Sequence, residues 1–155
     1  MQTFLPYPSF AVTARVLDPR RLGKQRVEAL QVLRALTVPG YGWRHHPAVR
    51  MWAGYREALV RYGLEICAQW RAGGRADTVA ATLAAEYGRR VRTQAELGVA
   101  GDLPPWLGWQ QLHDSHQSAL VRKDPGYYRP KFGDGVPADL PYLWPVSDRS
   151  ETADD

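Results

Sequence analysis

Residues 17–36 read LDPRRLGKQRVEALQVLRAL, and this stretch decides how the first part of the chain folds. Asp18 followed by Pro19 predicts a helix start, because aspartate caps free backbone amides and proline suits the first helical position. Apolar residues then recur at helical spacing, and Pro39-Gly40 predicts the end of the helix. The apolar face consists of Leu22, Ala29, Leu33 and Leu36, with Leu30 beside it.

Glu28 falls on the opposite, charged side of this helix, together with Arg21 and Lys24. One interpretation is a solvated pair with Lys24, which is worth only about 0.3–0.5 kcal/mol. The other is that Glu28 is the acid/base of a site lined by basic residues. Arg26 falls among the apolar positions, where a guanidinium needs a partner. That position predicts either a buried polar network or a cleft along the same edge.

Four further segments show helical patterns. Ser9 precedes a short turn that runs to residue 16, and Pro47 opens a long amphipathic helix that Gly73-Gly74 ends. Asp77 is the expected cap of a third helix that reaches residue 87. A fourth helix is expected over residues 110–122, and no pair of strands is evident.

The sequence therefore predicts an all-α protein with one compact helical domain over residues 1–147. After Asp124-Pro125 the chain is rich in proline and aromatic residues, which favours an extended C-terminal segment. Residues 148–155 are acidic, and we expect them to form a disordered tail.

The composition excludes several classes of protein. No apolar run approaches the roughly 18 residues of a membrane span, and the first ten residues lack the pattern of a signal peptide. Cys67 is the single cysteine, so neither an internal disulfide nor a cysteine-cluster metal site can form. We expect a cytoplasmic, nucleoid-associated monomer without contact to membranes.

The positive charge is concentrated near the N-terminus. The net charge is +4 over 155 residues, yet residues 1–50 hold eight arginines or lysines and only two acids, Asp18 and Glu28. Such a surface suits a phosphate-rich partner, because each neutralised phosphate releases condensed counterions.

The octapeptide RLGKQRVE at residues 21–28 resembles the opening helix of the pyrimidine-dimer DNA glycosylases. Their motif places an essential glutamate six residues after a leucine, as Leu22 and Glu28 are placed here. A weaker likeness extends to DPGYYRPKFG at residues 124–133. The resemblance implies the compact all-α fold of the endonuclease V type. It also implies a DNA repair glycosylase without cofactor or metal that acts on a pyrimidine dimer or related lesion in double-stranded DNA.

The resemblance also implies a mechanism. Family members attack C1′ of the damaged nucleotide with the α-amine of the chain, form an imine and can then cleave the strand as AP lyases. An α-amine, with a reference pKa of roughly 7.7–8.0, is partly neutral near pH 7. Glu28 then corresponds to the catalytic acid/base. Because Gln2 is large, the amine would belong to Met1, or to Gln2 after unusual processing.

Two departures from the family pattern leave the reaction open. Val27 and Gln31 stand where family members carry arginines. A hydrolytic glycosylase, in which Glu28 activates water, is therefore a second version of the same activity. The candidate DNA-binding residues are Arg20, Arg21, Lys24, Arg26, Arg44, His45, His46, Tyr127, Tyr128, Arg129 and Lys131.

Two alternatives come from other classes of protein. A non-catalytic nucleic-acid-binding protein could keep the fold without the chemistry. A metal-dependent hydrolase could use His45, His46, His113 or His116, of which the last two share one helical face. No third ligand is evident for such a metal.

Overall fold

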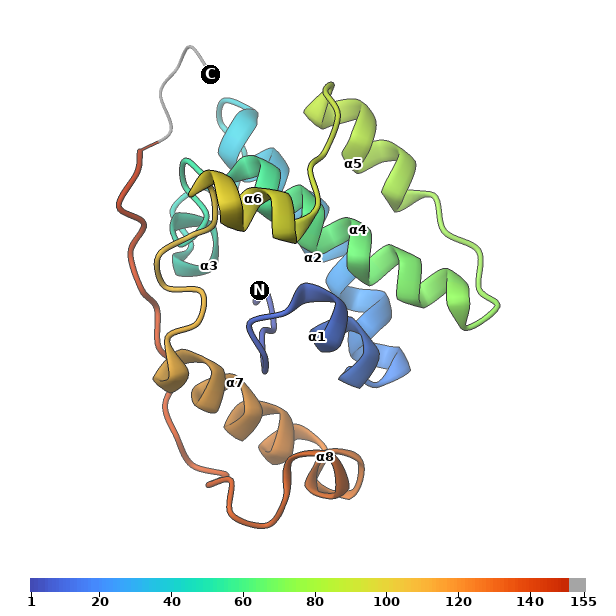
Figure 1. Cartoon of the computed structure of the whole chain (residues 1–155), viewed down its shortest axis with the longest axis vertical. Coiled ribbons are helices and arrows are strands. Elements are labelled where there is room, and N and C mark those ends of the chain that lie inside the picture. Colours follow the sequence, from blue (N-terminus) through green and yellow to red (C-terminus); the bar gives the residue numbers. More distant parts are fainter. Residues whose placement is uncertain (151–155) are drawn as a thin grey trace.

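The computed structural model describes residues 1–150, which fold into eight helices without a strand (Figure 1). The all-α fold predicted from the sequence is confirmed for these residues. None of these helices is both long and apolar enough to cross a membrane. The helices are α1 (Phe10–Val16), α2 (Pro19–Thr37), α3 (Pro47–Arg50), α4 (Arg56–Ala72), α5 (Val79–Tyr87), α6 (Gln94–Ala100), α7 (Gln110–Lys123) and α8 (Pro125–Phe132).

The central pair of helices is α2 and α4, against which α1 and α5 also pack. The expected caps are present: the Asp18 side chain accepts a hydrogen bond from the Arg21 amide, and Pro19 occupies the first helical position. Gly63 on α4 makes the close packing possible. A Cβ atom there would lie 2.7 Å from Leu83 and 3.1 Å from Ala29, so a larger residue would push the helices apart.

The prediction of a single long helix after Pro47 is wrong. The chain forms the short α3, leaves helical geometry, and starts α4 only at Arg56. Gly54 adopts a φ of +75°, which interrupts the helix and favours glycine. Trp52 and Tyr55 in this break are buried, so the apolar pattern continues although the helix does not.

Two helices lie where the sequence analysis expects none. Thr93 and Glu96 form a capping box that starts α6. The Asp124 side chain accepts from the Tyr127 amide and starts α8, which contains Pro130 near its end. The extended C-terminal segment therefore begins only after residue 132.

We call residues 138–150 the strap, because this extended segment runs along the molecule past α7 towards α3 (Figure 1). At its start, the Leu140 amide donates to the Ser118 hydroxyl, 3.0 Å away. Near its end, Tyr55 donates to Asp148 at 2.5 Å, and Arg149 donates to the Gly101 carbonyl and to Asp102. The tail expected from residue 148 thus begins with residues that contact the body, and residues 151–155 lie outside the described residues.

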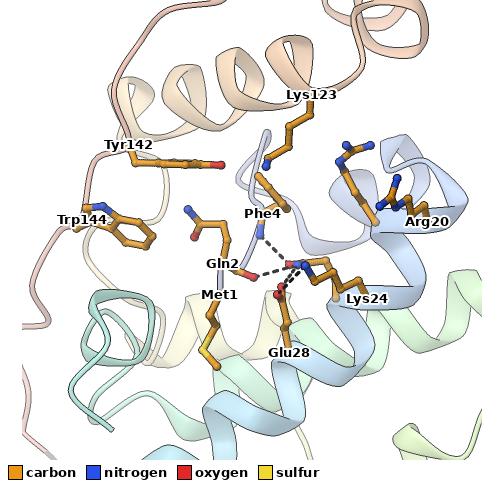
Figure 2. A pocket seen from close by; sticks show the side chains of 11 residues that line it. Met1, Gln2, Phe4, Arg20, Lys24, Glu28, Lys123, Tyr142 and Trp144 are labelled. Carbon is orange, nitrogen blue, oxygen red and sulfur yellow. Dashed lines mark hydrogen bonds and ion pairs between the residues drawn. The ribbon is translucent and has the colours of Figure 1, made fainter. Parts of the chain in front are cut away.

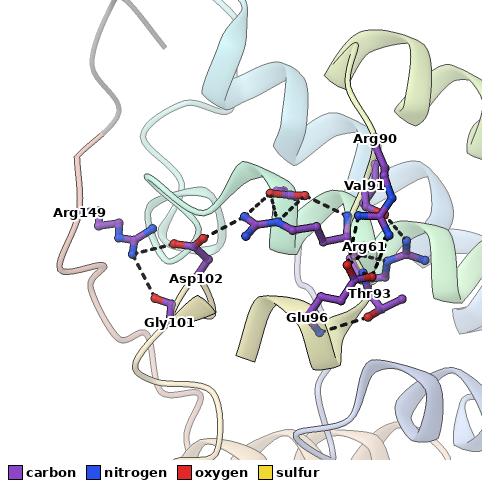
Figure 3. A network of polar contacts seen from close by, with 10 residues as sticks. Arg61, Arg90, Val91, Thr93, Glu96, Gly101, Asp102 and Arg149 are labelled. Carbon is purple, nitrogen blue, oxygen red and sulfur yellow. Dashed lines mark hydrogen bonds and ion pairs between the residues drawn. The ribbon is translucent and has the colours of Figure 1, made fainter. Parts of the chain in front are cut away.

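A network of arginines and carboxylates joins α4, α6 and the strap (Figure 3). Arg92 bonds to both oxygens of Glu57, the shortest at 2.6 Å, and to Asp102 at 2.9 Å. Arg149 reaches Asp102 from the strap at 3.2 Å. Arg61 donates to the carbonyls of Val91 and Arg92, which fixes the loop before α6.

Candidate active site

A cavity of about 370 Å³ opens between the start of the chain, the first half of α2, the end of α7 and the strap (Figure 2). We call it the Glu28 pocket. Its lining is basic and aromatic, and among the residues that the structure describes Glu28 is the only carboxylate in it. The lining residues are Met1, Gln2, Phe4, Arg20, Arg21, Lys24, Gln25, Glu28, Lys123, Tyr142 and Trp144.

The chain start is held beside Glu28 by the buried amide of Gln25. Gln25 Nε2 donates to the Gln2 carbonyl at 2.9 Å and to Glu28 Oε2 at 2.5 Å. Gln25 Oε1 accepts from the Phe4 amide at 2.8 Å and lies 2.7 Å from the Tyr62 hydroxyl. One side chain therefore fixes the first residues and the carboxylate relative to each other.

Two histidines of α7 hold the next part of the N-terminal segment. The Leu5 amide donates to His116 Nδ1 at 2.8 Å, and the Leu5 carbonyl lies 2.8 Å from His113 Nδ1. His113 Nε2 accepts from the Gly108 amide, so its Nδ1 carries the proton and donates to Leu5. Burial lowers the pKa of His113 and lowers that of His116 to about 3, which keeps both rings neutral.

These contacts leave the metal-dependent hydrolase without its ligands. Both ring nitrogens of His113 are occupied by backbone groups, and His45 and His46 belong to a different loop. Within residues 1–150, no three His, Cys, Asp or Glu side chains gather in a way that could hold a metal ion. The pair on α7 positions the N-terminal segment instead.

Glu28 is 7% exposed, and its environment is unlike that of a surface carboxylate. Burial raises its pKa above the ordinary value. Lys24, whose Nζ lies 3.9 Å from Oε1, opposes that shift, as do the charge of the N-terminal amine, the Gln2 backbone amide and the Gln25 side chain. The surface pair considered in the sequence analysis therefore exists, but the carboxylate itself is buried.

The first turn of α2 supplies cations at the pocket. The Arg21 guanidinium lies 3.1 Å from Asp18 Oδ1, and Asp18 also accepts from the Tyr128 hydroxyl. Burial raises the pKa of Asp18, but the hydrogen bonds from Tyr128 and Arg21 outweigh it and hold that pKa below its usual value. Asp18 thus holds the Arg21 side chain in place, whereas the side chains of Arg20 and Lys24 are exposed.

The aromatic wall of the pocket comes from the strap, and its Tyr142 was missed by the sequence analysis as part of a site. Tyr142 and Trp144 lie with ring centroids 5.5 Å apart, at 42° to each other. Figure 2 shows both rings on the side opposite Glu28. The signal was the short stretch PYLWP, whose prolines exclude a helix and leave its aromatic side chains to line a surface. Lys123, at the end of α7, was also missed.

Several predicted DNA contacts lie elsewhere. Arg26 binds Asp77 at 2.5 Å and stacks on Trp70, so it belongs to the buried network that its position suggested. Tyr128, a candidate DNA-binding residue, is completely buried, so its ring is not exposed to a nucleic acid. Arg129 donates to three backbone carbonyls between residues 133 and 136, which makes it a structural residue.

The remaining candidates do not line the pocket. Arg44 and His45 are exposed in the loop before α3. His46 caps α3 and packs edge-on against Trp144, with ring centroids 5.8 Å apart, and burial lowers its pKa. Tyr127 lies under Lys131, whose Nζ is 4.6 Å from the ring centroid. Neither Tyr127 nor Lys131 lines the pocket.

A family model described as pyrimidine dimer DNA glycosylase matches residues 1–83, which is more than half of the chain. The matched part includes the buried N-terminal segment and Glu28. Neither the curated proteins nor the solved structures gave a match. The chain belongs to the pyrimidine dimer DNA glycosylase family.

Proposed function

We propose that this protein releases a damaged base from duplex DNA by attack of its N-terminal amine on C1′, with Glu28 as acid/base. The observation that carries the proposal is the placement of Met1 and a buried carboxylate in one basic cavity. A chain start that is tied to Glu28 through Gln25 suits a reaction in which both groups act on one sugar.

The proposed reaction passes through an imine. The neutral amine of Met1 attacks C1′, the C1′–N bond breaks and its electron pair leaves with the base, which takes up the proton that the amine nitrogen loses. Opening of the sugar ring gives an imine, and loss of a C2′ proton then breaks the C3′–O bond. Glu28 stabilises the cationic sugar and accepts the C2′ proton. A carboxylate whose pKa is raised by burial suits this exchange of protons.

The basic residues supply the binding energy for the phosphates. Arg20, Lys24 and Lys123 are exposed at the pocket, and Arg21 is fixed there by Asp18. Contacts to phosphates position a duplex without reading its sequence. We further propose that the protein acts as a monomer on damaged double-stranded DNA in the cytoplasm.

The test is reductive trapping. Wild-type protein is incubated with borohydride and a duplex that contains a pyrimidine dimer or an abasic site, and the adduct is mapped by peptide mass. A covalent adduct on Met1 is expected, whereas one on Gln2 would identify a processed chain. Cleavage of the glycosidic bond without any adduct would establish the hydrolytic version, in which Glu28 activates water. Binding without base release or cleavage would contradict the proposal and favour the non-catalytic DNA-binding protein.

A further inference from the structure

An exposed tryptophan lies beside the Glu28 pocket, in the loop before α3. We call residues 41–46 the Trp43 loop, and Trp43 itself is 48% exposed. Its ring packs edge-on against His46, which in turn packs edge-on against Trp144 in the pocket wall, and both pairs of ring centroids are 5.8 Å apart. Trp43 is therefore no more than about 12 Å from that wall, which corresponds to roughly three to four steps of a duplex.

The Trp43 loop carries a positive charge that the fold does not use. No acidic residue occurs between residues 28 and 57. Arg44 is exposed, and its Nε donates to the neighbouring His45 at 3.2 Å. No carboxylate within residues 1–150 forms an ion pair with Arg44. The guanidinium thus keeps its other donors for an anion such as a phosphate.

The backbone of the Trp43 loop is held in shape by the loop itself. The His46 amide donates to the Trp43 carbonyl at 2.9 Å, and the Arg44 amide donates to the Tyr41 carbonyl at 3.4 Å. His46 also caps α3, because its Nδ1 accepts from the Ala48 amide at 3.0 Å. Side chains on a loop that is already formed lose less conformational freedom when they bind a partner.

An exposed ring beside an unpaired guanidinium fits the backbone of a nucleic acid. Deoxyriboses and phosphates alternate along each strand, so the ring and the cation can contact neighbouring groups. A protein partner would require a wider apolar surface, whereas Trp43 stands between Gly42 and Arg44.

We infer that the Trp43 loop is a second DNA contact, which holds the duplex a few base pairs from the lesion. Trp43 packs on a deoxyribose, and Arg44 pairs with a phosphate. This inference rests on the proposed function. Figure 2 shows Arg20 and Trp144 on opposite sides of the pocket, so Arg20 and the Trp43 loop hold the duplex on both sides of the reacting sugar. Two separate backbone contacts fix the register and orientation of a duplex, which brings C1′ to the amine.

The test uses thymine-dimer duplexes that differ in where they end. One extends about 15 base pairs on each side of the lesion, and the other two are shortened to about two base pairs on one side or the other. Cleavage of the glycosidic bond is followed with protein in excess of DNA but below saturation. Alkali then breaks the strand at each abasic site, so both versions of the reaction are detected.

On the long duplex, we expect the rate to fall by about 10-fold for Trp43→Ala and about five-fold for Arg44→Ala. One of the shortened duplexes lacks the flank that the Trp43 loop contacts. There the wild type should slow by a similar factor, and the variants should lose no more than about two-fold relative to it. On the other shortened duplex the variants should keep their full deficit, because that flank is still present.

The matched control is Trp109→Ala, since Trp109 is 41% exposed and lies outside both the pocket and the Trp43 loop. It should leave the rate on each duplex unchanged. Deficits of Trp43→Ala and Arg44→Ala that are equal on all three duplexes, or absent from all three, would overturn the second contact alone. A wild-type protein that does not cleave even the long duplex would overturn the proposed function and this inference with it.

Discussion

Two glutamates of this molecule, the buried Glu28 and the partly buried Glu57, differ in how their charge is compensated. Arg92 donates to both oxygens of Glu57, and hydrogen bonds from Arg92 hold the pKa of Glu57 below its ordinary value. The cation nearest to Glu28 is Lys24 at 3.9 Å, and burial raises the pKa of Glu28. The same residue type is thus stabilised as a carboxylate in one place and destabilised in the other.

This difference in charge compensation indicates which carboxylate is available for a reaction. In the network around Arg92, acids and bases satisfy each other and join parts of the chain that are far apart in sequence. At the Glu28 pocket the cations outnumber the single carboxylate, so positive charge is left for a partner. A satisfied cluster serves the fold, whereas an unsatisfied one is available for a substrate.

The largest expected effect comes from exchanging the two carboxylates for amides. Glu28→Gln should lower the rate of base release by about 10²–10⁴-fold, because proton transfer and charge stabilisation are both lost. Its affinity for the damaged duplex should stay within about three-fold, since phosphate contacts dominate binding. Single-turnover kinetics and fluorescence anisotropy measure the two effects. Glu57→Gln is the matched control and should keep the rate. Equal rates for wild type and Glu28→Gln would remove Glu28 from the site.

The ion pair between Arg26 and Asp77 tests whether an arginine that is paired with a buried carboxylate stabilises the fold. The Asp77 side chain is fully buried, so Arg26→Ala should cost about 2–3 kcal/mol of unfolding free energy and lower Tm by roughly 4–12 °C. Arg71→Ala is the control, because Arg71 is half-exposed and lies 3.3 Å from the same carboxylate. It should lower Tm much less. An unchanged Tm in Arg26→Ala, read by thermal denaturation, would show that its contact with Asp77 does not support the fold.

The unbalanced cations should be visible in the salt dependence of binding. Replacement of Arg20 and Lys24 together by alanine should reduce the log–log slope of affinity against salt by up to about two units, at roughly 0.9 per phosphate. The loss should be the same for damaged and undamaged duplexes. The control exchanges Arg34 and Arg90, which are already paired with Glu86 and Glu96. A slope that changes equally in both double variants would mean that the pocket cations have no special role.

The smallest effect is a pH-dependent difference in stability. The pKa of Glu28 is raised in the folded protein, so its favourable contribution is present at low pH and is lost as the pH rises through that pKa. The Tm of Glu28→Gln relative to wild type should therefore increase between pH 4 and pH 7. The pKa of Glu57 is lowered, so the destabilisation of Glu57→Gln should be largest at pH 7 and shrink on acidification. If the Tm differences of the two variants from wild type changed with pH in the same way, the opposite pKa shifts of Glu28 and Glu57 would be contradicted.

Local signals in the sequence were sufficient for the elements that carry Glu28. The pair Asp18-Pro19 predicts the start of α2, and the spacing of Leu22 and Glu28 indicates the family. The break at Gly54 could not be predicted, because Trp52 and Tyr55 continue an apolar pattern while the backbone turns away. A periodic pattern reports burial and does not report whether the helix is continuous.

The contacts that assemble the pocket connect distant parts of the chain. No local pattern around Leu5 indicates that His113 and His116 will hold its backbone. Tyr142 likewise reaches the pocket only because the strap is fixed at Ser118 and at Asp102, on two separate elements. Periodicity and capping rules describe neighbours within one turn of helix, so such arrangements lie beyond them.

The bond between Leu5 and His116 also has a consequence for biosynthesis. It spans 111 positions, so the residues that leave the ribosome first receive their partners only when α7 has been translated. Until then the amide and carbonyl of Leu5 lack the histidines that hold them in the finished protein. A nascent chain that ends within the first five helices contains Gln25, which holds Gln2 and Phe4, but it lacks the histidines that hold Leu5. The anchoring of the chain start is therefore complete only when synthesis is nearly complete.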